Sequence, residues 1–131
     1  MPKIISNIPE SQLKNYISLS YEMLAQAWLT KAGFEAQLIT ADFGKKTDLI
    51  VFDGRKQYRI QIKSITTMTE NLKVENEWKG ADIDYVIYFN KIEDWGYIAP
   101  AFSESKRLLN HKSHIRFHQH PKNFIKAFEK A

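Results

Sequence analysis

Cysteine is absent from this chain of 131 residues. Its absence excludes disulfide bonds, thiolate metal sites and cysteine nucleophiles, and it suits a reducing cytoplasmic compartment, where we expect the protein to reside. Long apolar runs are also missing: no stretch approaches the roughly 18 residues that a membrane-spanning helix needs, so we expect no membrane association. The opening residues, MPKIISNIPE, lack the charged start, apolar stretch and small-residue cleavage site of a secretion signal.

Glycine and proline are sparse, with 5 and 4 residues respectively, and no stretch rich in them divides the chain. With 131 residues, of which 44% are hydrophobic, the chain has enough apolar material for one compact core. We therefore expect residues 1–131 to form a single domain. The formal net charge of +4 favours an anionic partner, although lysine and arginine are spread along the chain as they are on an ordinary solvated surface.

The order of the predicted elements indicates an α/β fold. Residues 9–32 are expected to form a helix, because apolar side chains recur at helical spacing and Gly33 follows as a terminator. A closing helix is expected at 121–131 and a short one at 103–110, while the polar stretch 66–80 reads as a loop. Strands are expected at 34–42, 47–52, 55–65, 84–90, 95–100 and 114–119. This order predicts a mixed β-sheet flanked by helices.

The segment TDLIVFDGRKQYRIQIKS, residues 47–64, reads as a hairpin whose two faces differ in polarity. With Asp53-Gly54 as a two-residue turn, Phe52 pairs with Arg55, and Asp48 falls opposite Arg59. Because side chains alternate across a strand, one face then collects four polar residues. These are Asp48, Arg59, Gln61 and Lys63. The opposite face collects the core-like residues Leu49, Val51, Tyr58, Ile60 and Ile62. Any even loop length preserves this division.

The polar face has the chemistry of a divalent metal site. Asp48 offers a hard oxygen ligand for Mg²⁺, and Gln61 offers a neutral carbonyl oxygen. Lys63 places a cation where it could orient water or offset charge on a phosphate. One carboxylate holds Mg²⁺ weakly, and Glu22 on the N-terminal helix is the best candidate for a second. Each of these residues also has an ordinary interpretation as a solvated charge or a strand-end ion pair.

Together these residues resemble the PD-(D/E)xK nuclease superfamily, and in particular its small group I intron homing endonucleases. Glu22 on a helix, then GKKTDLIVFDG with Asp48, then YRIQIKS with Gln61 and Lys63 stand in the order of that family, over roughly residues 10–100. More distantly, they are similar to archaeal Holliday-junction resolvases. Thr47 stands where the motif has proline, and Gln61 stands where an acid is usual. Glutamine does occur at that position in the intron-endonuclease group.

The resemblance implies a restriction-endonuclease-like core and a Mg²⁺-dependent phosphodiesterase, with Mn²⁺ as a possible substitute. It assigns Asp48, Gln61, the main-chain carbonyl of Ile62 and Glu22 to the metal, and Lys63 to catalysis. The function that follows is a site-specific DNA endonuclease, intron- or phage-encoded, acting as a homodimer or homotetramer on double-stranded DNA. DNA contacts are expected from Lys45, Lys46, Lys73, Lys79, Lys112 and Arg116.

Three alternatives remain open from the sequence. The first is a Holliday-junction resolvase or restriction-type nuclease, which would read the shape or sequence of a different DNA. The second is a DNA-binding module whose nuclease site has degenerated, as the neutral Gln61 would allow. The third is an α/β interaction domain that does not bind nucleic acid at all.

Overall fold

A computed structural model describes residues 7–39 and 46–131 of the chain. It begins with a long helix, α1 (Glu10–Lys31), which follows Pro9 and is terminated by Ala32 and Gly33, where φ of Gly33 is +103°. A helix-terminating residue in this left-handed conformation is best supplied by glycine. The chain closes with a second helix, α2 (Pro121–Lys130). No helix in the described residues has both the length and the apolar character to cross a membrane.

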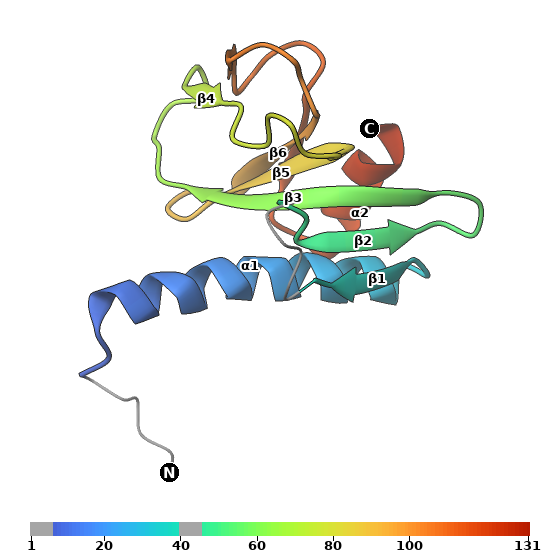
Figure 1. The fold of residues 1–131 in the computed structure, drawn as a ribbon, viewed down its shortest axis with the longest axis horizontal. Helices are drawn as coiled ribbons and strands as arrows, with labels where there is room; N and C mark the ends of the chain where they lie inside the picture. The colour runs from blue at the N-terminus through green and yellow to red at the C-terminus, as the bar shows by residue number, and fades with distance from the viewer. Residues whose placement is uncertain (1–6, 40–45) are drawn as a thin grey trace.

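The segment of the chain between the two helices forms a six-stranded mixed sheet in the order β1-β2-β3-β5-β6-β8 (Figure 1). Strands β3 and β5 run parallel, and the other neighbours run antiparallel. The strands are β1 (Glu35–Leu38), β2 (Leu49–Phe52), β3 (Gln57–Ile65), β5 (Tyr85–Asn90), β6 (Trp95–Pro100) and β8 (Ile115–His118). The predicted α/β fold with a mixed, helix-flanked sheet is therefore confirmed.

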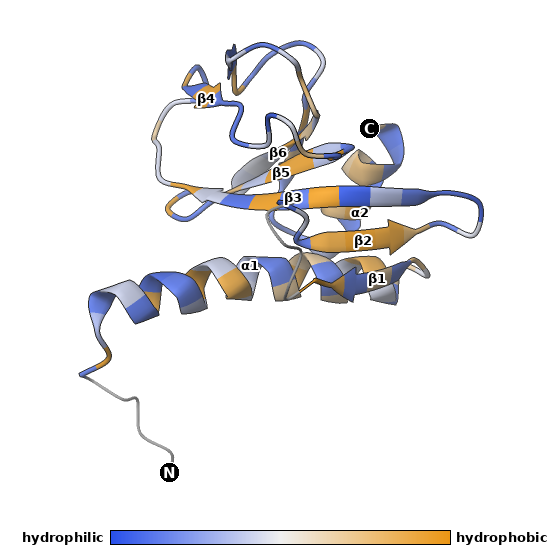
Figure 2. Ribbon diagram, viewed as in Figure 1, coloured by the Kyte–Doolittle hydropathy of each residue, from blue (hydrophilic) through white to orange (hydrophobic). Residues whose placement is uncertain are grey.

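The two faces of the sheet are covered differently. Both helices pack on one face, where Leu29 of α1 and Phe124 of α2 join a buried cluster with Leu49, Ile60 and Phe89 of the strands. The other face carries a second cluster, built on β5 and β6 and covered by the connecting segments that hold the short strands β4 (Lys73–Glu75) and β7 (Lys106–Leu108). Figure 2 shows β2 as hydrophobic along its length and β3 as alternating, which is the pattern of a strand with one polar face.

The hairpin register differs from the prediction by two residues. Phe52 pairs with Gln57, not Arg55, because the loop contains four residues and not two. The Asp53 side chain accepts hydrogen bonds from the N–H groups of Arg55 and Lys56, both at 2.8 Å, and this local network holds the longer loop. Since the loop length stays even, the polar and apolar faces keep their predicted members.

The predicted helix at 103–110 is wrong, because this segment contains β7. Strand β7 pairs antiparallel with β4, which itself lies inside the segment predicted as a loop. The N–H of Leu109 donates to the carbonyl of Leu72 at 2.7 Å and extends this two-stranded ladder. Local sequence could not predict the pairing, because its two partners are about 30 residues apart and a strand depends on its neighbour.

Candidate active site

The observed register brings Asp48 next to Gln61. Leu49 pairs with Ile60, and the N–H of Asp48 donates to the carbonyl of Ile60 at 2.9 Å, so the residue before β2 faces the middle of β3. The carboxylate of Asp48 accepts a hydrogen bond through Oδ2 from the N–H of Ile62 at 2.7 Å. The N–H and C=O of a strand residue point toward the same neighbouring strand, so the Ile62 carbonyl also faces the side of Asp48.

Helix α1 carries Glu22 to the same place. Burial, then the negative charge of Asp48, then a hydrogen bond with Asp48 raise the pKa of Glu22 to about 7. Burial disfavours the ionised form of Glu22, and the adjacent Asp48 carboxylate adds repulsion between two negative charges. The structure thus brings together the helix-borne acid and the hairpin acid that the sequence analysis selected.

These residues line a cleft of about 590 Å³. The lining residues come from α1, β3, β4 and the residues on either side of β4, together with Asp48 and Tyr88. Its lining is largely polar and consists of Ser18, Glu22, Asp48, Gln61, Ile62, Lys63, Ser64, Ile65, Leu72, Lys73, Val74, Glu75, Glu77 and Tyr88. All four predicted catalytic residues therefore lie in one cavity.

Gln61 provides the test of whether a cation fits this site. Its side chain is 5% exposed, and its Oε1 finds no hydrogen-bond partner among residues 7–39 and 46–131. A buried oxygen without a partner destabilises a fold unless something binds it. Within the described residues no group of three or more histidine or acidic side chains converges, so two acids need neutral oxygens to complete a metal shell. The donor set of two carboxylates, the Gln61 amide and the Ile62 carbonyl fits Mg²⁺.

Lys63 is paired with Glu77, a residue that sequence analysis did not select. Its ammonium forms an ion pair with the Glu77 carboxylate, and the side chains of Lys63 and Glu77 are 34% and 51% exposed. Glu77 lies in the stretch predicted as a loop, where no periodic pattern marked it. Only the folding of that stretch over β3 reveals the contact.

Tyr88 is the second residue that was missed. It pairs with Lys63 across the parallel strands β3 and β5, so its side chain lies on the same face of the sheet. Burial, with the nearby charge of Glu77, raises the pKa of Tyr88 far above its usual range, and the hydroxyl keeps its proton. Sequence analysis predicted a strand over 84–90, which contains Tyr88, but it did not predict that Tyr88 lies beside Lys63.

The predicted DNA contacts are dispersed over the surface. Lys73 lines the cleft, and Lys46 is exposed two residues before Asp48. Lys79 and Lys112 are exposed in connections away from it. Arg116 donates from Nε to Glu70 at 2.8 Å and lies over the ring of Trp95. Lys45 falls outside the described residues.

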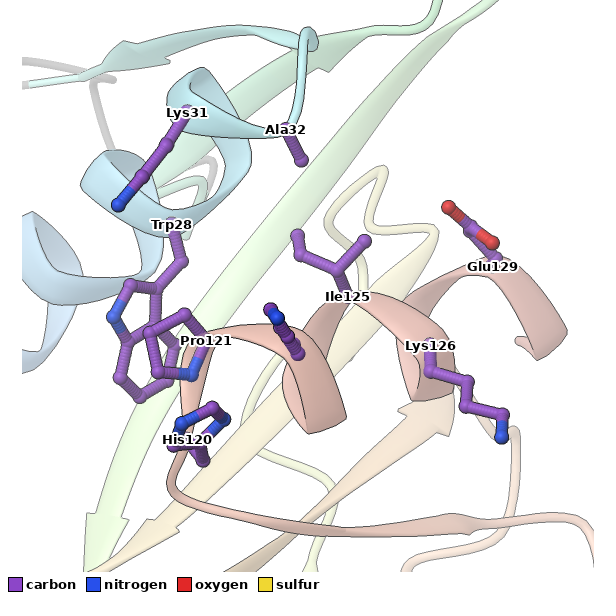
Figure 3. A pocket seen from close by; sticks show the side chains of 9 residues that line it. Trp28, Lys31, Ala32, His120, Pro121, Ile125, Lys126 and Glu129 are labelled. Atoms are coloured by element: carbon purple, nitrogen blue, oxygen red, sulfur yellow. The ribbon is translucent and has the colours of Figure 1, made fainter.

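A second cavity, of about 550 Å³, lies between the C-terminal half of α1 and α2 (Figure 3). Its walls include the apolar side chains of Trp28, Pro121 and Ile125, with Lys31 and Lys126 at the sides. Glu129 is the one carboxylate among the described residues that line it. It therefore lacks the paired acids of the first cleft, which we take as the candidate active site.

Comparison with known proteins agrees with the fold. No family model matches the sequence, and no curated protein sequence matches it either. Among solved structures, a bacterial homing endonuclease, I-Ssp6803I, is similar with a TM-score of 0.54 at 20% identity, covering 86% of this chain and 78% of that one. The Holliday junction resolvase Hjc of Archaeoglobus fulgidus gives a TM-score of 0.48 at 18% identity, covering 68% of this chain and 80% of its own. The fold is restriction-endonuclease-like, and the resemblance to homing endonucleases is confirmed at the level of the fold.

Proposed function

We propose that the protein is a Mg²⁺-dependent DNA endonuclease of the PD-(D/E)xK type that cuts at a specific site, as homing endonucleases do. The observation that carries this proposal is one cleft in which Glu22 and Asp48 share a proton-binding site beside the unpartnered Oε1 of Gln61. Two acids and a neutral oxygen donor around one space are what a hard divalent cation requires.

In this mechanism, Asp48, Gln61, Glu22 and the Ile62 carbonyl would hold the metal ion. When bound, Mg²⁺ would supply Lewis-acid charge at the scissile phosphodiester. The Lys63 ammonium offsets the negative charge that develops on the phosphate oxygens as water attacks. The Glu22 carboxylate orients that water through a hydrogen bond. The water oxygen adds to phosphorus as the bond from phosphorus to the 3′ oxygen breaks. The water gives up a proton and the leaving 3′ oxygen takes one up, so the products are a 3′-hydroxyl and a 5′-phosphate.

The surroundings of the cleft support DNA as the substrate. Lys73 lines the cleft, and Lys46 is exposed two residues before Asp48, so both are candidates for contacts with backbone phosphates. The described residues of one chain form one such cleft, so cutting both strands of a duplex requires two copies or two successive events. This is the reason to expect a homodimer or a homotetramer.

The experiment that tests the proposal compares wild type with Asp48→Ala on linear duplex, supercoiled plasmid and four-way junction DNA, with and without Mg²⁺. The proposal predicts Mg²⁺-dependent cleavage by wild type alone, and the preferred substrate separates a homing or restriction-type nuclease from a junction resolvase. Cleavage by both proteins would show that the site is elsewhere.

A DNA-binding module without catalysis is the second candidate. The observation that favours it is the ion pair of Lys63 with Glu77, which occupies the cation that catalysis needs. This candidate predicts DNA binding that is independent of Mg²⁺ and unchanged by Lys63→Ala, with no cleavage of any of the three substrates.

A further inference from the structure

Tyr88 lines the cleft, and its hydroxyl group has no role in the proposed mechanism. Tyr88 is 3% exposed, and its Oη has no hydrogen-bond partner within the described ranges of the chain. A buried tyrosine usually finds a partner for its hydroxyl, because leaving the group unpaired costs stability. A phenylalanine would fill the same space without that cost.

A buried tyrosine on the neighbouring strand β6 has a hydrogen-bond partner for its hydroxyl. Tyr97 is the cross-strand partner of Tyr88 and is also buried, yet its hydroxyl donates to the Glu70 carboxylate. Both side chains belong to the same cluster on the same face of the sheet. The hydroxyl that lies away from the cleft is satisfied, and the hydroxyl in the residue that lines the cleft is not.

Two further groups surround Tyr88. Lys63 is its partner across β3 and β5, and Glu77 lies close enough for its charge to act on the Tyr88 hydroxyl. Glu77 also holds the Lys63 ammonium. An entering phosphodiester would compete with the Glu77 carboxylate for Lys63 and repel it, since both are anions. Displacement of Glu77 would leave two donors, one ammonium and one hydroxyl, facing the same anionic oxygen.

We propose that Tyr88 is a phosphate-contacting residue of this cleft, whose hydroxyl donates a hydrogen bond to a non-bridging phosphate oxygen once the phosphate has displaced Glu77 from Lys63. This inference rests on the proposed function, because it concerns the same cleft. It adds the Tyr88 hydroxyl as a hydrogen-bond donor to the phosphate, and it gives the Glu77 carboxylate the role of opposing substrate entry.

The test uses deoxythymidine bisphosphate as the probe, titrated calorimetrically into the full chain in Mg²⁺. Tyr88→Phe should weaken binding roughly ten- to hundredfold, as loss of a hydrogen bond to a charged group does. Its thermal unfolding midpoint in the absence of probe should be unchanged or higher, because the lost hydroxyl had no partner. Tyr85→Phe is the matched control, since Tyr85 lies on the same strand but packs in the cluster on the helix-covered face. It should bind the probe as wild type does.

Glu77→Gln should shift affinity in the opposite direction, with several-fold tighter binding of the same probe, because the competing carboxylate is gone. Unchanged binding by Tyr88→Phe would overturn the inference, as would weakened binding accompanied by an equal loss in Tyr85→Phe. Absence of probe binding by wild type would overturn it too.

Cleavage assays separate this inference from the proposed function. If wild type cuts DNA and Tyr88→Phe cuts it with the same kcat/KM, the phosphate contact is wrong while the nuclease assignment stands. If wild type binds the probe through Tyr88 but no DNA is cut, the nuclease assignment is wrong while the phosphate contact stands.

Discussion

Asp48 is bonded to the strand that carries the rest of the candidate site: its Oδ2 accepts the N–H of Ile62 at 2.7 Å. This bond holds the Asp48 carboxylate against the backbone of β3 between Gln61 and Lys63. It also ties the site to the fold, because the same residue donates its own N–H to Ile60 at 2.9 Å. Asp48, Gln61 and Ile62 are therefore held together by hydrogen bonds to and within the sheet, and Glu22 is supplied by α1.

Asp48→Asn separates the structural from the chemical role of this residue. The amide oxygen can still accept the Ile62 N–H, so the fold should persist, while the charge that holds Mg²⁺ is lost. We expect cleavage to fall by a factor on the order of 100 or more, and the Mg²⁺-dependent rise in unfolding temperature to disappear. Asp82→Asn, at an exposed aspartate that does not line the cleft, is the control and should leave both measurements unchanged. A Mg²⁺ response that survives in Asp48→Asn would contradict the assignment.

Gln61→Glu restores the acid that is usual at this position in the resembled superfamily. A third negative charge should tighten Mg²⁺ binding by about tenfold at pH 8 and destabilise the metal-free protein, because three carboxylates then share a partly buried space.

Gln61→Met tests the same position in the opposite direction. It removes the unpartnered oxygen, and we expect it to abolish Mg²⁺ binding while stabilising the metal-free protein by about 1 kcal/mol. Calorimetric titration with Mg²⁺ and urea unfolding in EDTA measure both effects, and equal Mg²⁺ affinity in the two variants would refute the role of Gln61.

The raised pKa of Glu22 predicts a pH dependence of stability in the absence of metal. The ordinary value is 4.5 and the value in the folded protein is about 7, so between these pH values the folded state holds a proton that the unfolded chain has released. The free energy of unfolding should therefore fall as the pH rises through this window. Because Glu22 is only partly buried, solvent screening limits the loss to about 1–2 kcal/mol. Urea unfolding in EDTA at a series of pH values measures it. Glu22→Gln should flatten the slope in this range, and an unchanged slope would show that another group titrates.

The sequence predicted which residues form the site better than it predicted which of them are direct neighbours. The shared face of Asp48, Gln61 and Lys63 follows from strand alternation alone and survives any even loop, so it was predictable. The exact neighbour of Asp48 was not, because the Asp53 side chain stabilises a four-residue loop and moves the register from Arg59 to Gln61.

The residues that sequence reasoning missed have a different cause. Glu77 reaches Lys63 only because the segment around β4 folds back over β3, and β4 finds its partner in β7, about 30 residues away. Tyr88 has the pattern of an ordinary core residue, and its unpaired hydroxyl is a property of the packed structure. Long-range pairing and hydrogen-bond satisfaction leave no local pattern in a single sequence.

The basic residues beside the cleft predict how DNA binding depends on salt. Each lysine that neutralises a phosphate releases about one counterion, so Lys46→Ala and Lys73→Ala should each reduce the slope of log affinity against log salt concentration by about 1, for specific and unrelated duplexes alike. Lys56→Ala is the matched control. Lys56 lies in the loop between β2 and β3, where its ammonium is 5.3 Å from the centre of the Tyr58 ring, and it does not line the cleft. Fluorescence anisotropy in Ca²⁺ at several salt concentrations measures the slopes. If Lys56→Ala reduces the slope of log affinity against log salt concentration as much as the other two variants do, DNA lies across a different surface. The cleft would then not be the site that binds the scissile phosphate.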